Sequence, residues 1–203
     1  GLLYSSRVGG DYLDRCRALA IDRQGAAYVS GYTHSSDFPA LPVPGSIGPS
    51  SPQWWNATFV VKLNPSATEV IYASLVGGTS SDWVYDIAVD DGGSAYVTGS
   101  TPSEDFPTTP DSFNSSHPGS EDIFVYKLVP TGNMLDYSGL LGGAESETGS
   151  GIEVDASGRA YVTGWTYSPD FPVTDGALQP MLGGSRDAFV VKVSSGGSRL
   201  LYS

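Results

Sequence analysis

The stretch AVDDGGSAYVTG at residues 88–99 decides the fold, because versions of it occur three times in the chain. It returns as AIDRQGAAYVSG at residues 20–31 and as EVDASGRAYVTG at residues 153–164. Each copy places a polar, glycine-containing turn between two apolar runs, which is the pattern of a β-hairpin. A repeated unit of this kind defines the whole fold, so the remaining motifs are interpreted around it.

Three further motifs accompany each hairpin at nearly constant spacing. Asp-Phe-Pro follows it at residues 37–39, 105–107 and 170–172, and a run ending in Lys-Leu or Lys-Val lies at 59–63, 124–128 and 189–193. The tyrosine of a final strand recurs at Tyr4, Tyr72, Tyr137 and Tyr202. The chain therefore consists of three tandem repeats of about 65 residues.

Each repeat predicts four strands joined as two hairpins, and thus a four-stranded antiparallel sheet. Both faces of this sheet are apolar, since Phe59, Val61 and Leu63 alternate with Val60. A sheet that is apolar on both faces needs a neighbour on each side. Radial stacking of sheets meets this need, so we expect an all-β fold, a β-propeller built of four-stranded blades. An open linear stack of blades is the alternative arrangement.

The repeat boundaries divide the chain into three blades and a leading strand. We expect residues 1–10 to form the last strand of a preceding blade, with blade 1 at 11–76, blade 2 at 77–141 and blade 3 at 142–203. Propellers use about four to eight blades, so three do not close a ring. Further blades or identical chains are therefore the predicted partners, and two chains closing a six-bladed ring is one such assembly.

The composition excludes several classes of function. The formal net charge of −12 argues against binding to nucleic acid, which needs a basic surface. It argues equally against an anionic membrane surface, and no apolar run approaches the roughly 20 residues of a spanning helix, so no membrane insertion is expected. Cys16 is the one cysteine, so an internal disulfide is ruled out. When the three repeats are aligned, Cys16 falls at the same position as Val84 and Gly149, and residues that align in this way are said to share a repeat column. This column predicts a small buried side chain.

The quoted motifs, together with the Tyr-Ser-x-x-Leu-Gly-Gly string, resemble the SBBP family of β-propeller repeats over essentially the whole chain. The first-strand portion is also similar to NHL-type blades. The resemblance implies a secreted or cell-surface protein in which such repeats serve as scaffold or adhesion modules. It implies no catalytic residues and no cofactor.

The three lysines of the chain, Lys62, Lys127 and Lys192, occupy one repeat column. A ring of ligand contacts is one interpretation, but the same residue is rarely needed for function in every blade. We instead expect structural ion pairs that fasten the long loop of each blade to its sheet. The predicted partners are the repeated aspartates Asp37, Asp105 and Asp170.

Tryptophans break the repeat pattern and are the candidate ligand-binding residues. Trp54 and Trp55 lie in the loop that carries an insertion, while Trp83 and Trp165 have no counterpart in their repeat columns. Exposed indole rings suit contacts with sugars or proteins. The alternative is that these rings fill gaps between unequal blades.

Two sequons, beginning at Asn56 and Asn114, are candidate glycosylation sites. Both lie in the long loop between the second and third strands of a blade. They therefore predict an extracellular protein with sugar on one rim.

No catalytic site and no metal site is predicted. His34 and His117 lie in loops of different context, and no serine elbow, Cys–His pair or metal-spaced histidine cluster is visible. The segment Asp90-Asp91-Gly92-Gly93 lacks the ligand spacing of a calcium loop, and a weakly bound cation is the alternative at the acidic connections, which are Asp11 and Asp14, Asp82, and Glu145 and Glu147. The sequence thus favours a non-catalytic extracellular scaffold or adhesion module. A carbohydrate-binding propeller is the first alternative, and a polysaccharide-cleaving enzyme is the second.

Overall fold

The computed structural model describes residues 1, 3–38, 47 and 57–203. They form three antiparallel sheets of four strands. The first sheet comprises β1 (Asp14–Ile21), β2 (Ala27–Thr33), β3 (Ala57–Leu63) and β4 (Val70–Val76). The second comprises β5 (Trp83–Val89), β6 (Ala95–Thr101), β7 (Asp122–Leu128) and β8 (Leu135–Leu141). The third comprises β9 (Glu147–Val154), β10 (Ala160–Thr166), β11 (Asp187–Val193) and β12 (Leu200–Tyr202).

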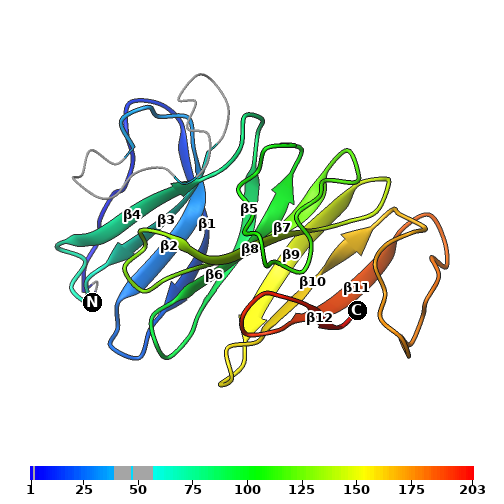
Figure 1. Ribbon diagram of the computed structural model, residues 1–203. Helices are drawn as coiled ribbons and strands as arrows, with labels where there is room; N and C mark the ends of the chain where they lie inside the picture. The colour runs from blue at the N-terminus through cyan, green and yellow to red at the C-terminus, as the bar shows by residue number, and fades with distance from the viewer. Residues whose placement is uncertain (2, 39–46, 48–56) are drawn as a thin grey trace.

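The sheets stand side by side in chain order, as in successive blades of a propeller (Figure 1). Within each sheet the strands follow one another in sequence order. The expected all-β fold of four-stranded blades is therefore confirmed. A closed ring is not seen among the described residues, because the first and third sheets lie at opposite ends of the row (Figure 1).

The hairpin turns form as the sequence predicts. In the second sheet, Oδ1 of Asp90 accepts a hydrogen bond from the Ser94 N–H at 2.9 Å, and the turn closes at Gly93 with φ of 83°. The Tyr96 hydroxyl then donates to Asp90 Oδ2 at 3.0 Å. The aspartate of the repeated motif thus ties the turn to the tyrosine of the following strand.

The core lies between the sheets rather than inside any one of them. Every residue of β6 is buried, as expected for a strand with sheets on both sides. One apolar cluster joins the first two sheets through residues such as Tyr72 and Phe124. A second cluster joins the second and third sheets through residues such as Ile123 and Val162. The prediction that both faces of a blade need a neighbour is borne out for the middle sheet.

The start of the chain does not form the strand expected over residues 1–10. Residue 1 and residues 3–13 form no strand, although residues 1–10 carry the motif of a final blade strand. A strand needs a partner strand for its backbone groups, and the twelve strands of the described residues are all paired within their own three sheets. Val8 nevertheless packs on the cluster of the first sheet that contains Phe59. In the repeat alignment Val8 corresponds to Val76, which packs against the second sheet.

Cys16 is exposed, which contradicts the expected buried side chain. Its counterpart Val84 is 0% exposed, and Ile87, the counterpart of Leu19, is 4% exposed. Leu19 itself is 61% exposed. The reason is that the first sheet covers Val84 and Ile87 in the second sheet. Among the described residues, no sheet covers the corresponding face of the first.

The described part of the chain contains no helix with the length and apolar character needed to cross a bilayer.

Candidate interaction face

The third sheet turns one face away from the rest of the protein, and we call it the open face. Strand register places its residues together, since Tyr161 pairs with Glu153 and Lys192, and Thr163 pairs with Val190. Residues on the opposite face, such as Val162 and Phe189, pack against the second sheet. The open face includes Glu153, Tyr161, Thr163, Trp165, Ala188, Val190, Lys192 and Tyr202.

The same columns are buried in the first two sheets. Val60 and Val125 are fully buried, whereas Val190 is 56% exposed. Tyr72 and Tyr137 are 1% exposed, whereas Tyr202 is 40% exposed. The difference arises because the first two sheets are each followed by another sheet, which covers these columns. The open face therefore repeats a surface that twice serves as an interface within this chain.

A tyrosine–glycine contact defines how one sheet fits the next. Gly132, in the turn between β7 and β8, lies directly on the ring of Tyr72 in the first sheet, so that an added Cβ would meet Tyr72 Cγ at 2.6 Å. Gly197 lies on Tyr137 in the same way. Both glycines have positive φ. Tyr202 occupies the next position in this series, and its ring is partly exposed.

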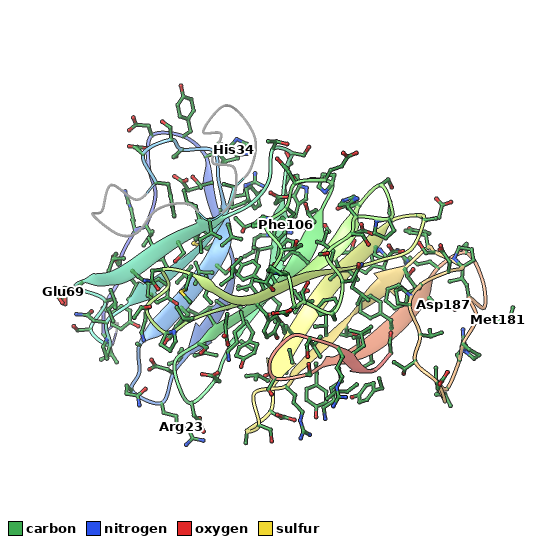
Figure 2. All side chains as sticks on the ribbon, in the orientation of Figure 1. Arg23, His34, Glu69, Phe106, Met181 and Asp187 are labelled. Carbon is green, nitrogen blue, oxygen red and sulfur yellow. The ribbon has the colours of Figure 1, made fainter. Side chains whose placement is uncertain are left out.

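A cavity of about 600 Å³ adjoins the open face. Its lining includes Leu178, Val190 and Tyr202. In the second blade the counterpart of Leu178 is Phe113, which packs against the third sheet and donates its N–H to the Gly197 carbonyl at 2.7 Å. Leu178 is fully exposed, and the loop that carries it and Met181 extends away from the sheets (Figure 2).

The lysines form ion pairs with different partners from those predicted. Lys62 lies 3.6 Å from Asp22, and Lys192 lies 3.7 Å from Asp155. Lys127 pairs with Asp136 at 2.8 Å. Each ammonium also lies over the tyrosine of the neighbouring strand, at 4.7, 5.3 and 4.4 Å from the ring centroids of Tyr28, Tyr96 and Tyr161. Lys62 and Lys192 thus fasten the hairpin turn and its tyrosine, whereas Lys127 fastens the tyrosine to β8, and none of the three pairs with the predicted loop aspartate.

Asp37, Asp105 and Asp170 hold the junction between blades. Their Oδ1 atoms accept hydrogen bonds from the backbone N–H groups of Asp11, Thr79 and Ala144 at 2.8 to 3.0 Å. Each donor directly follows a Gly-Gly pair. The predicted pairing of these aspartates with lysine was wrong because their oxygens are directed at the junction backbone instead.

The remaining predicted site residues take mostly structural positions. Trp83 packs edge-on against Tyr32 of the first sheet with ring centroids 5.0 Å apart. The Arg186 guanidinium lies 5.5 Å from the Trp165 ring centroid. Asn114 forms a turn in which its Oδ1 accepts the Ser116 N–H at 3.0 Å. Trp54, Trp55 and Asn56 lie outside the described residues.

A carboxylate at each blade junction, buried in the second and third blades, has a larger structural role than the sequence indicated. Asp82 accepts hydrogen bonds from the Gly78 N–H at 2.8 Å and from the hydroxyls of Thr101 and Ser103 at 2.5 and 2.9 Å. Asp14 and Glu147 make the corresponding contacts in their own blades. Burial, opposed in part by these donors, raises the pKa of Asp82 to about 6. The signal in the sequence was an acid four residues after each Gly-Gly pair, together with a Thr-x-Ser motif at the end of the second strand.

The comparisons agree with the architecture. A family of β-propeller repeats, SBBP, matches the chain at residues 3–39, 71–107 and 136–172. Each match runs from the tyrosine motif of one blade, through the Gly-Gly junction, to the Asp-Phe-Pro of the next. No curated protein matches the sequence. Because the matches cover more than half of its residues and fall once in each repeat, the chain belongs to the SBBP family of β-propeller repeats.

Proposed function

We propose that this chain is a non-catalytic structural module of an extracellular or cell-surface protein, and that its open face binds another blade of the same repeat. When the chain is alone in solution, a second copy supplies that blade. The observation that carries the proposal is the exposure of Val190 and Tyr202 in columns that are buried twice elsewhere in the same molecule.

The energetics of burial support this partner. Burying a large apolar side chain contributes about 1.5–3 kcal/mol. Val190, Tyr202 and Leu178 together thus offer several kcal/mol to a surface that fits them. A blade of the same repeat fits because it presents aliphatic side chains in the column of Ile87 and a small residue with positive φ in the column of Gly132, which is Ala67 in the first blade.

The contacts of the histidine and tryptophan side chains favour a scaffold over the two alternatives. His117 Nδ1 lies 3.2 Å from Asp122 Oδ2 and its Nε2 lies 3.0 Å from the Thr101 carbonyl oxygen, so both ring nitrogens are engaged within the protein. The rings of Trp83 and Trp165 are in contact with Tyr32 and Arg186 respectively. These contacts leave less of each side chain for proton transfer to a substrate or for stacking on a sugar.

An extracellular location is supported by the sequon at Asn114. It lies in an exposed turn, where a sugar would meet solvent rather than the core. We expect native material to carry hexose-containing adducts. An intact mass equal to that of the bare polypeptide would contradict glycosylation at this rim.

Self-association on a sensor surface tests the binding proposal. Immobilised chain should capture soluble chain, and Val190→Asp in both the immobilised and the soluble chain should reduce capture at least tenfold, because a carboxylate would be desolvated in the interface. Met134→Asp is the matched control, since Met134 is also exposed but lies in the turn between β7 and β8. Equal loss with both variants, or capture unaffected by Val190→Asp, would refute the proposed role of the open face.

A further inference from the structure

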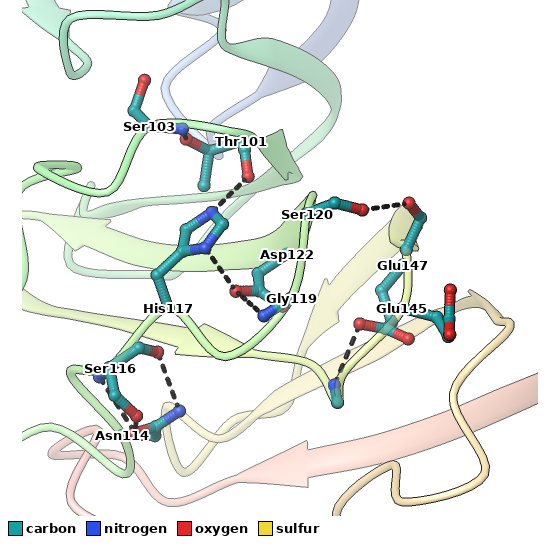
Figure 3. Close-up of polar contacts among 12 residues, drawn as sticks. Thr101, Ser103, Asn114, Ser116, His117, Gly119, Ser120, Asp122, Glu145 and Glu147 are labelled. Atoms are coloured by element: carbon teal, nitrogen blue, oxygen red, sulfur yellow. Dashed lines mark hydrogen bonds and ion pairs between the residues drawn. The ribbon is translucent and has the colours of Figure 1, made fainter.

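The junction between the second and third sheets contains a pair of buried carboxylates that the first junction lacks. Asp122 begins β7 and Glu147 begins β9 (Figure 3), and both side chains are 0% exposed. At the junction between the first and second sheets, the counterpart of Glu147 is Asp82, and the counterpart of Asp122 is Ala57. The first junction, which has Asp82 but no second carboxylate at Ala57, therefore serves as an internal control for the second junction.

One oxygen of Asp122 has no hydrogen-bond donor. Its Oδ2 receives His117 Nδ1 at 3.2 Å, but its Oδ1 is buried without a partner. A Cβ added to Gly142 would touch both this Oδ1 and, at 2.5 Å, Glu147 Oε2, so both carboxylates lie against that glycine, where Oε2 also accepts the Gly143 N–H at 3.0 Å. A Cβ on Gly119 would meet the Gly143 carbonyl oxygen at 2.6 Å and Asp122 Oδ1 at 3.1 Å. Acceptor oxygens of Glu147 and Gly143 thus lie close to the two glycines that border Oδ1.

Two ionised carboxylates in such a position repel one another strongly in a low-dielectric interior, and one proton between them removes the repulsion. The acidic side chains around Asp122 outnumber the basic ones. His117, from the preceding loop, lies against Asp122 Oδ2 and carries a positive charge only when it is protonated. The acidic groups nearby are Glu147 from β9, Glu121 (hydrogen-bonded to Ser100), Glu145 in the junction segment and Asp170, which accepts the Ala144 N–H.

A proton suits this position better than a metal ion does. Within the described parts of the chain, no group of three or more histidine, cysteine or acidic side chains is placed to hold a metal. Asp122 Oδ1 is also sealed from solvent, whereas a hard cation needs six or more oxygen ligands. A proton requires no added volume and supplies the missing donor.

We propose that Asp122 and Glu147 share one proton across the blade junction, and that this proton makes the attachment of the third sheet to the second sensitive to pH. Protonation turns a repulsive contact into a hydrogen bond between the sheets. Burial raises the pKa of Asp122, although His117 opposes the shift, and Glu147 raises it further. Because the folded pair holds its proton more tightly than the unfolded chain does, the junction is strongest in mild acid and weakens as the pair ionises.

The decisive variant is Glu147→Asp, which shortens the side chain to the aspartate present at the other two junctions. It leaves His117 untouched while withdrawing the carboxylate from Asp122. For the wild type, we expect this pair to make the unfolding equilibrium constant measured in urea about tenfold smaller near pH 5 than near pH 7.5. The reason is that the folded protein binds about one more proton than the unfolded chain over about one pH unit. Glu147→Asp and Asp122→Asn should both remove this part of the pH dependence. Asp187→Asn is the control, because Asp187 accepts hydrogen bonds from Gln179 and Gly183 instead.

Carbon-13 NMR of the carboxyl groups measures the shared proton directly. We expect the Asp122 carboxyl to retain its proton to about pH 6, and its titration to move to lower pH in Glu147→Asp. Independent titration of both groups below about pH 5 would overturn the proposal. So would a calcium-dependent rise in stability at about pH 7.5 that Asp122→Asn abolishes, since the position would then hold a cation.

Discussion

Gly132 lies on the ring of Tyr72, with an added Cβ only 2.6 and 2.7 Å from Tyr72 Cγ and Cε2. The two residues belong to different sheets, and the contact recurs between Gly197 and Tyr137. The Ser74 hydroxyl reinforces it by donating to the Gly132 carbonyl oxygen at 2.5 Å. The glycine thus meets two requirements at once, because its φ of 70° is costly for other residues and its missing side chain makes room for the ring.

Replacing Gly132 with alanine should therefore destabilise the protein by about 2–4 kcal/mol, from backbone strain plus displacement of the Tyr72 ring. Urea unfolding monitored by tyrosine fluorescence measures the loss. The matched position in the first blade is Ala67, which has φ of 51°. Ala67→Gly should stabilise the protein by about 0.5–1 kcal/mol. A Gly132→Ala variant as stable as the wild type would show that the turn does not lock the two sheets.

Tyrosines in equivalent columns should respond differently to loss of the hydroxyl. The Tyr72 hydroxyl is buried without a partner, so Tyr72→Phe should leave stability unchanged or raise it by about 1 kcal/mol. Tyr28 donates to Asp22 Oδ2 and the Gly93 carbonyl oxygen, both at 3.2 Å, so Tyr28→Phe should lose about 1–2 kcal/mol. The two variants are compared by thermal and urea unfolding. A larger loss for Tyr72→Phe than for Tyr28→Phe would contradict the assigned hydrogen bonds.

Stability should depend on pH through Asp82. Its pKa of about 6 in the folded protein exceeds that of an unfolded aspartate, so folding takes up a proton between the two values. The contribution to stability is fully present below about pH 4 and is lost as pH rises through about 6. Between about pH 7.5 and pH 5 the gain is about 1 kcal/mol, and Asp82→Asn should abolish it. If the variant and the wild type show the same dependence of stability on pH, Asp82 is not the group responsible.

The sequence predicted the fold because each structural requirement appears three times. Turn glycines such as Gly93 and strand residues such as Val97 recur at fixed spacing, and this spacing determines hairpins whatever the neighbours are. The sequence also marked the tyrosine column that includes Tyr72, although it did not reveal the glycine that packs on it. That contact joins residues of different repeats, and neither residue alone indicates its partner.

The lysine partners could not be predicted for a related reason. Lys62 and Asp37 recur together in every repeat, but recurrence does not determine in which direction a long flexible side chain points. Lys62 packs over Tyr28 toward Asp22, where burial of its aliphatic stem and the aromatic face both favour it. Cys16 was misjudged because burial in its column depends on a neighbouring sheet, and not on the repeat itself.

The mass of the particle in solution, measured by light scattering as the protein concentration is raised, tests most directly whether the open face binds another blade. We predict that the mass rises above the 21.2 kDa of one chain and that Val190→Asp returns it to that value, while Met134→Asp does not. A mass of 21.2 kDa at every concentration would contradict the account, because the face that exposes Val190 and Tyr202 would then be stable without a partner.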